Sequence, residues 1–330
     1  MQRLVLCSLL ALQCGAALAA SSTEAQCQAA ARHAYPAAHR APASLLPALA
    51  NCSPTDLYYG IGAPADPVRA RQCALAAVLE DQPFRADRGV LMMVYANGLG
   101  VARDYSLARK AACEAGGAPA ELSGRLAHLA ELEAGRKGAQ ARIDVCDDAT
   151  SGYMGGWCAS VSARRAEQAR GADFARLTAA WSARDKQALA SLEKAARRFA
   201  DLRSSEEVDL SGTLRGAFVT QEEARQLANF RAAIAGFERG ALPKDSAAEH
   251  ARLDARLNAV YGQLRKLPPS QFSTVRFAGI QQTQRGWLAY RDAWVAFGKV
   301  KYPRVPADAW RSHFTRERVV MLEGLLKSLR

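Results

Sequence analysis

The stretch that decides the fold is Gln284-Arg285-Gly286-Trp287-Leu288-Ala289-Tyr290-Arg291-Asp292. Within and beside it, residues recur at spacings of three and four, the period of one helix face: Ile280, Gln284, Trp287, Arg291 and Trp294. This face is mostly apolar, yet it carries an amide and a guanidinium. A charge turned toward a core is tolerated when it is paired and hydrogen-bonded, and Asp254 or Asp292 is a candidate partner. The pattern fits either a structural ion pair in a helical bundle or a recognition site.

The rest of the chain has the same helical period. No run of β-branched residues alternates with period two, so the sequence predicts an all-α protein. We expect helices at about residues 157–183, 184–204, 220–240, 245–266 and 272–298, and a last one after Pro306. Thr220-Gln221-Glu222-Glu223 has the pattern of a capping box, which predicts a helix start there. Trp287, Trp294 and Trp310 are predicted core residues of a three- or four-helix bundle.

The start of the chain has the pattern of an export signal. Arg3 precedes an almost wholly apolar run from Leu4 to Leu12, and Ala17-Leu18-Ala19 supplies the small-x-small pattern of a cleavage site. We therefore expect residues 1–19 to be a signal peptide. No later run approaches the ~20 apolar residues that span a bilayer, so we expect no transmembrane segment. The expected location is the periplasm or the exterior.

Six cysteines remain after the signal: Cys27, Cys52, Cys73, Cys113, Cys146 and Cys158. An even number in an exported chain indicates disulfides. The sequence allows every pairing of the six, and the pairing that closes the shortest loops in order is 27–52, 73–113 and 146–158. Metal ligands are usually clustered, as in paired Cys-x-x-Cys, and this chain has no such cluster. We expect no metal and no cofactor.

Positive charge is concentrated in the last eighty residues, which hold fifteen Lys or Arg against five Asp or Glu. A basic patch often binds nucleic acid, but export disfavours that partner. Anionic envelope polymers, lipid headgroups or an acidic protein fit better. The alternative is a solvated basic surface without a specific partner.

Residues 88–121 predict a helical hairpin. One helix should end at Asn97-Gly98 with a left-handed C-cap, and a second should begin after Asp104 and turn Leu107 inward. The stretch resembles the Sel1-like repeat in six positions: Tyr95, Gly98, Gly100, Val101, Asp104 and Ala108. The resemblance implies a protein-binding helical domain, which we place at residues 20–143. A single repeat cannot bury its own face, so flanking helices must cap it.

The last part of the chain resembles the LprI-like lysozyme-inhibitor family. Three motifs in order carry the resemblance: Asp254 to Tyr261, Gln284-x-x-Trp287-x-x-Tyr290-Arg291-Asp292, and Arg318 to Leu322. It implies an exported, helical, non-catalytic binding domain, which we place at residues 144–330. Many relatives have a Cys soon after Arg-Asp and another in the last helix, whereas Trp294 and the Ser312–His313 region stand here.

Catalysis is not indicated. The five histidines lie far apart in sequence, and neither His-Glu-x-x-His nor Gly-x-Ser-x-Gly occurs. We therefore expect a binding protein and not an enzyme. Its candidate binding residues are Gln284, Arg285, Trp287, Tyr290, Arg291, Asp292, Lys299 and Lys301.

Two kinds of partner fit the prediction of a non-catalytic binding protein. The first is lysozyme or another muramidase, whose cleft holds two carboxylates that a projecting cation could pair with. Arg285, Lys299 and Lys301 are the candidates for that cation, and the sequence does not choose among them. The second is an envelope adaptor function, in which the basic helical domain and the repeat bind a protein or an anionic wall polymer.

Overall fold

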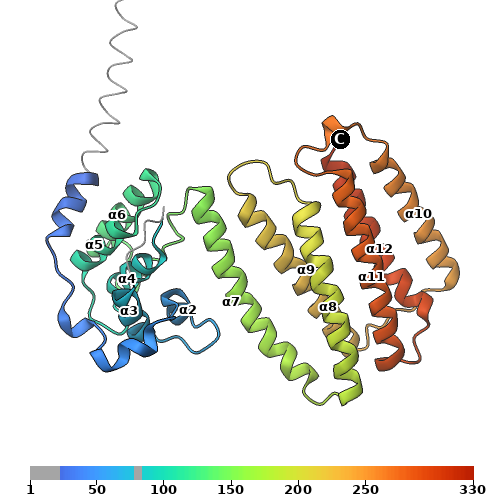
Figure 1. Cartoon of the computed structure of the whole chain (residues 1–330), viewed down its shortest axis with the longest axis horizontal. Coiled ribbons are helices and arrows are strands. Elements are labelled where there is room, and N and C mark those ends of the chain that lie inside the picture. The colour runs from blue at the N-terminus through green and yellow to red at the C-terminus, as the bar shows by residue number, and fades with distance from the viewer. Residues whose placement is uncertain (1–22, 78–83) are drawn as a thin grey trace, which may run out of the picture. The chain divides into compact units, whose positions relative to one another are not determined.

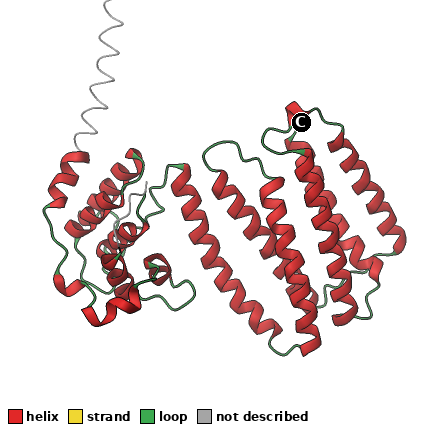
Figure 2. Cartoon of the chain, in the orientation of Figure 1, coloured by secondary structure: helices red, strands yellow, loops and turns green. Residues whose placement is uncertain are grey.

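The computed structural model describes residues 23–77 and 84–330. Within these ranges all regular structure is helical and no strand forms; Phe84 and Gly116 make an isolated bridge (Figure 2). The all-α prediction is confirmed. None of the helices in the described part combines the length and apolarity that crossing a membrane demands. The predicted signal peptide lies outside the described residues.

The described residues divide into two compact units, one before and one after the bond between Cys158 and Ala159. In the first, residues 23–31 are helical. The further elements are η1 (Ala37–His39), η2 (Ala43–Leu49), α2 (Pro54–Tyr59), α3 (Pro67–Ala76), α4 (Ala86–Asn97), α5 (Tyr105–Ala115) and α6 (Pro119–Glu133) (Figure 1). Helix α4 is the centre of this unit, because every residue from Arg88 to Asn97 is buried. Flanking helices thus cover α4 on all its faces.

The predicted hairpin is formed by α4 and α5. Helix α4 ends at Gly98, which is left-handed with φ 65°, and the Asp104 side chain accepts the backbone N–H of Leu107 at the start of α5. Leu107 is buried as expected. The helix bounds of the hairpin are confirmed, while its relation to the Sel1-like repeat stays a prediction.

The disulfides are Cys27–Cys113, Cys52–Cys73 and Cys146–Cys158. The third confirms the sequence prediction, and the pairings 27–52 and 73–113 are wrong. The helix at residues 23–31 lies beside α5 and α6, which brings the Cα atoms of Cys27 and Cys113 to 5.5 Å. The hairpin of α2 and α3 brings Cys52 to Cys73. Loop length therefore misled the prediction because packing between distant helices determines which cysteines meet.

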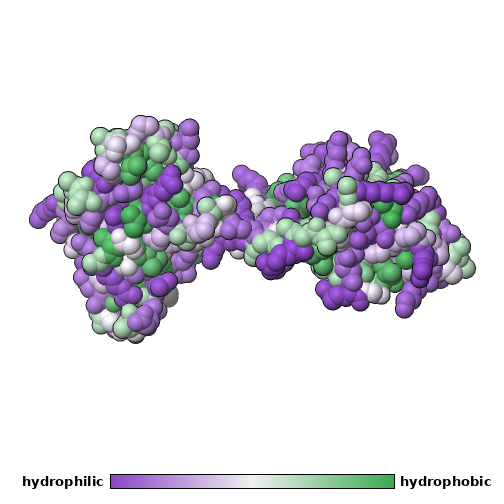
Figure 3. Space-filling model, turned by 90° about the horizontal axis from the view of Figure 1, so that it is seen from below, coloured by the Kyte–Doolittle hydropathy of each residue, from purple (hydrophilic) through white to green (hydrophobic). Residues whose placement is uncertain are grey.

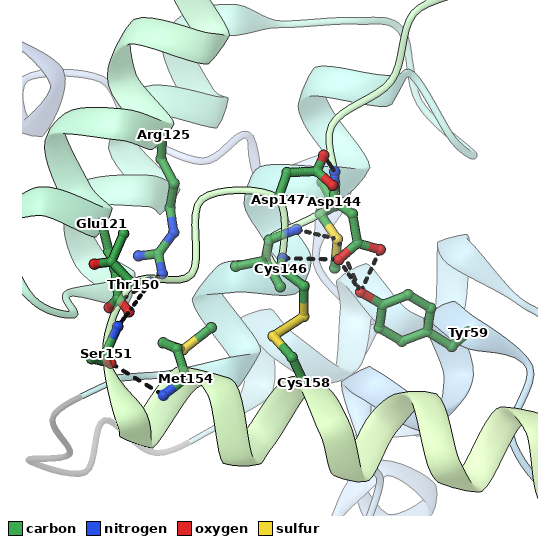
Figure 4. Close-up of a disulfide and its surroundings, with 12 residues drawn as sticks. Tyr59, Glu121, Arg125, Asp144, Cys146, Asp147, Thr150, Ser151, Met154 and Cys158 are labelled. Carbon is green, nitrogen blue, oxygen red and sulfur yellow. Dashed lines mark hydrogen bonds and ion pairs between the residues drawn. A yellow bond between two sulfur atoms is a disulfide. The ribbon is translucent and has the colours of Figure 1, made fainter. Parts of the chain in front are cut away.

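The division between the two units falls within one helix, α7 (Gly152–Thr178). The sequence placed the boundary after residue 143, and the compact units divide after Cys158. Figure 4 shows what ties the start of α7 to the first unit: the Cys146–Cys158 disulfide, and Glu121, whose carboxylate accepts the N–H groups of Thr150 and Ser151 at 2.9 and 2.7 Å. Met154 is fully buried in the core of the first unit.

The second unit contains the rest of α7 and the long helices α8 (Ala183–Glu206), α9 (Arg215–Glu238), α10 (Ala247–Arg265), α11 (Phe277–Lys301) and α12 (Ala307–Ser328), with a short turn, η3 (Pro269–Gln271). Helix α8 packs on α9 and α11, and α12 packs on α10 and α11. Trp287, Trp294 and Trp310 are 0–2% exposed, so their prediction as core residues is confirmed. Hydrophilic residues cover most of the face of each unit that Figure 3 shows.

Glycines let α11 pack closely. A β-carbon on Gly286 would collide with Leu202 of α8, and one on Gly298 would collide with Trp310 of α12. Gly286, within residues 284–292, is thus a position at which α8 and α11 pack closely.

Three predicted helix starts are wrong by five residues: α7 begins at Gly152 and not at 157, α11 begins at Phe277 and not at 272, and the start at 220 also fails. Helix α9 begins at Arg215, and Thr220 lies inside it. The capping-box pattern failed because it needs Thr220 and Glu223 at a helix start, whereas α9 already extends from Arg215 through both residues. The neighbouring Glu222 is buried and binds Arg203 and Gln226.

Peptide mapping of the oxidised protein without reduction should recover linked peptides for 27–113 and 52–73, and none for 27–52 or 73–113. Replacing Cys27 and Cys113 by Ala should cost about 4.5 kcal/mol of unfolding free energy in the chain-entropy picture, against about 3.3 for Cys52 and Cys73, because the first loop is longer. Equal losses measured by denaturant unfolding would contradict this ranking.

Candidate functional site

The second unit is organised around a buried ion pair between Arg318 of α12 and Glu207, the residue that ends α8. Both side chains are fully buried. The guanidinium binds the carboxylate at two points, with Nη1 to Oε2 at 2.8 Å and Nη2 to Oε1 at 2.5 Å. Bidentate geometry of this kind lets a buried pair offset its desolvation cost.

The pair belongs to a larger network. Arg203 donates to Glu207 at 2.5 Å, and its Nε lies 3.2 Å from a carboxylate oxygen of Glu222. Arg225 also pairs with Glu222. Three arginines, counting Arg318, therefore share two carboxylates.

Burial raises the pKa of Glu207, but the positive charges and hydrogen bonds of Arg318 and Arg203 outweigh this effect and hold its pKa below the usual range. Gln284 completes the network, because its Oε1 accepts the Nε–H of Arg318 at 2.9 Å. Two of the three sequence motifs thus meet in the core: Gln284 comes from one and Arg318 from the other.

Arg291 is not the buried charge of the core, contrary to one interpretation of the sequence. Its side chain is 14% exposed, pairs with the well-exposed Asp292 at 3.0 Å, and lies 5.2 Å from the centre of the Trp287 ring. Asp254, the other suggested partner, instead accepts a hydrogen bond from Asn258. Arg318 has the role that spacing suggested for Arg291.

The remaining predicted binding residues differ in exposure. Trp287 and Tyr290 are buried, whereas Arg285 and Lys299 are exposed. Lys301 is the last residue of α11 and not part of the following loop. Its ammonium lies 3.4 Å from Asp185 and 4.2 Å from the centre of the Trp181 ring, so it already has partners.

Exposed cations form two groups in the part of the chain from α10 to α12. The first group consists of cations at the end of α10, on the early part of α11 and at the end of α12: Arg265, Lys266, Arg276, Arg285, Lys327 and Arg330. Arg330 donates a hydrogen bond to Gln263 of α10 at 2.9 Å, and the ring centroid of Tyr261 of α10 lies 5.4 Å from that of Phe277. These contacts bring the three segments together.

The second group lies at the turn between α11 and α12 and consists of Lys299 and Arg304. Pro303 directly precedes Arg304 and Pro306 follows Val305, so the backbone is restricted on both sides of Arg304. Tyr302 fixes the turn by donating to Glu238 at 2.6 Å. Within residues 23–77 and 84–330, no cation of either group takes part in an ion pair. Sequence reasoning missed Arg304, although its two flanking prolines mark a stiff exposed turn.

A groove of about 860 Å³ lies between α9 and α12, with α8 and α11 beneath it. Aromatic rings line its depth: Phe199, Phe230, Trp287, Tyr290 and Phe314. Phe237 closes one end, with its ring centroid 5.0 Å from that of Trp310. The sequence did not predict this groove, since it depends on α9 and α12 diverging beyond their contact at Phe237.

Residues 241–322 match the family model described as Lysozyme inhibitor LprI. The match covers about a quarter of the 330 residues and includes α10, α11 and most of α12. It supports the resemblance found in the sequence for this part of the second unit, with the helical, non-catalytic inhibitor domain that the family implies. Neither a curated protein nor a solved structure matches the chain.

Replacing Arg318 by Met should lower the unfolding free energy by about 3–5 kcal/mol, because Glu207 loses its bidentate partner inside the core. The matched change Arg291→Met should cost no more than about 1 kcal/mol, since Asp292 remains solvated. Urea unfolding of both variants tests this, and equal losses would remove Arg318 from its central role.

Glu207 also predicts an acid dependence of stability. Its pKa is lower in the folded protein than the value of about 4.3 for an unfolded chain, so its contribution is complete above that pH and is lost as pH falls through the folded pKa. The stability difference between wild type and Glu207→Gln should therefore be constant near neutral pH and shrink below about pH 4.3. A difference that is the same at pH 3 and pH 7 would argue against a stabilised Glu207 carboxylate.

Proposed function

We propose that the protein is an exported, non-catalytic inhibitor of the lysozyme type, and that the turn between α11 and α12 is its contact surface. The match of residues 241–322 to the LprI family is the observation that carries the proposal. The location in the periplasm or outside the cell rests on the signal-like sequence of residues 1–19.

The turn suits a cleft that holds two carboxylates. Arg304 and Lys299 are exposed and have no ion-pair partner to give up in the described part of the chain. The prolines on either side of Arg304 reduce the ordering cost of binding. Lys301 has a structural role instead, because it binds Asp185.

Long-range electrostatics opposes this contact and short-range electrostatics favours it. Animal lysozymes are basic, so a basic inhibitor domain is repelled at a distance. Salt screens that repulsion beyond about 8 Å, whereas pairs formed inside a cleft are screened much less. We therefore expect inhibition to strengthen from low to physiological salt.

The test is cell-wall lysis by hen lysozyme and by a bacterial muramidase, with the full oxidised chain as inhibitor. Wild type should inhibit at near-stoichiometric amounts. Lys299→Ser/Arg304→Ser should weaken inhibition at least roughly tenfold, because a hydrogen bond to a charged group contributes about 1.5–3 kcal/mol. The matched control Arg265→Ser/Lys266→Ser removes the same charge at the other group and should inhibit like wild type.

No inhibition by wild type at large excess would rule out the proposal. A loss confined to Arg265→Ser/Lys266→Ser would place the contact surface at the other group of cations.

A second candidate is an envelope adaptor that binds an anionic wall polymer. The first group of exposed cations favours this function. The nearby Asp209 carboxylate does not neutralise these cations, because it accepts hydrogen bonds from Ser273 and Thr274 instead. In this function the α4–α5 hairpin would contact a protein, as a Sel1-like repeat does. Polyphosphate binding that falls with salt and is lost in Arg265→Ser/Lys266→Ser would support it.

A further inference from the structure

The α12 wall of the groove carries an apolar strip. Three side chains form that strip, Val320, Met321 and Leu325, and Val320 is 64% exposed. The same wall also carries His313, Arg316 and Glu317, which are already paired: Glu317 with His313, and Arg316 with Asp245 and Glu249. Among the large hydrophobic residues exposed in the described chain, Val320 has the highest exposed fraction. Aromatic rings continue this apolar surface to the bottom of the groove.

The opposite wall is polar at its Arg225–Asn229 end and apolar from Phe230 to Phe237. Helix α9 places Arg225, Gln226 and Asn229 along it, and Arg203 of α8 lies beneath them. The network below supplies two carboxylates, Glu207 and Glu222, to three arginines, so it has one positive charge in excess. Arg225 exposes 59% of its side chain and can bind a further anion without leaving Glu222.

Glycines keep both walls open. Gly236 of α9 and Gly324 of α12 line the groove, and a β-carbon on either would meet no atom within 4 Å. The volume, about 860 Å³, lies in the range of about 300–1,000 Å³ that is typical of small-molecule sites.

We propose that this groove binds a single-chain anionic amphiphile, with the acyl chain along the α12 wall and the carboxylate or phosphate head at Arg225. The apolar strip on α12 favours a ligand with an acyl chain over a fully polar ligand such as a sugar. The excess positive charge distinguishes an anionic head from a neutral one. This proposal is independent of the inhibitor function, whose contact surface is the α11–α12 turn.

The experiment is calorimetric titration of the full oxidised chain with laurate below its critical micelle concentration, and with monolaurin as a neutral probe. Wild type should bind laurate at least roughly tenfold more tightly than monolaurin. A tenfold difference in dissociation constant is about what one hydrogen bond to a charged group contributes. Arg225→Gln should remove this preference. Arg276→Gln, an exposed arginine outside the groove, should retain it.

A second pair of variants tests the place of the acyl chain. Gly324→Leu fills the groove, should keep or raise the melting temperature because Leu favours a helix more than Gly does, and should abolish laurate binding. Gly262→Leu, on α10 and also without a neighbour at its β-carbon, should bind like wild type. Gly236→Leu repeats the test from the other wall.

Absence of laurate binding by wild type would overturn the proposal. Undiminished binding by the two groove-filling variants would overturn it equally. Equal affinity for laurate and monolaurin would overturn the assignment of the anionic head to Arg225.

Discussion

The bidentate pair of Arg318 with Glu207 is the constraint on which the second unit depends. It joins α12 to the end of α8, and through Arg203 and Glu222 it also joins α9. Gln284 adds α11 to the same centre. A buried charge pair tolerates little displacement, because each lost hydrogen bond leaves charge in a medium that cannot solvate it. The network therefore fixes the register of four helices, while the surrounding aromatic rings supply apolar burial that has less directional preference.

The two units reach stability in different ways. The three disulfides of the described residues lie in the first unit, where short helices surround the buried α4. The second unit has long helices and a core that contains Trp287, Trp294 and Trp310. The Cys146–Cys158 disulfide and Glu121 hold the start of α7 in the first unit, so the unit boundary falls inside a helix. Short helices bury less apolar surface, so disulfides add to the stability of the first unit. The long helices of the second unit form an apolar core instead.

Much of the fold could be predicted from local patterns, and what failed depended on packing. Helical period located the long helices, and Gly98 and Asp104 located the α4–α5 turn, because caps and periodicity are properties of neighbouring residues. The cysteine pairs involving Cys27 and Cys52, the role of Glu222 and the identity of the buried arginine all depend on residues far away in sequence. Of the candidate site, the sequence indicated Lys299 but missed Arg304 and the groove. Spacing shows that Arg291 and Trp287 share a face, yet only packing shows that Arg318 is the arginine in the core.

The match of residues 241–322 to the inhibitor family and the unpaired cations of the α11–α12 turn support our proposal that this stiff cationic turn enters a carboxylate-bearing cleft. The groove between α9 and α12 is a separate feature of the same unit, so one domain could hold two ligands at once. The most direct measurement of the central claim is the affinity of the full chain for a muramidase, with and without a saturating oligosaccharide that fills the muramidase cleft. Our account predicts that the oligosaccharide competes with the protein and abolishes binding. Undiminished affinity with the cleft filled would contradict it.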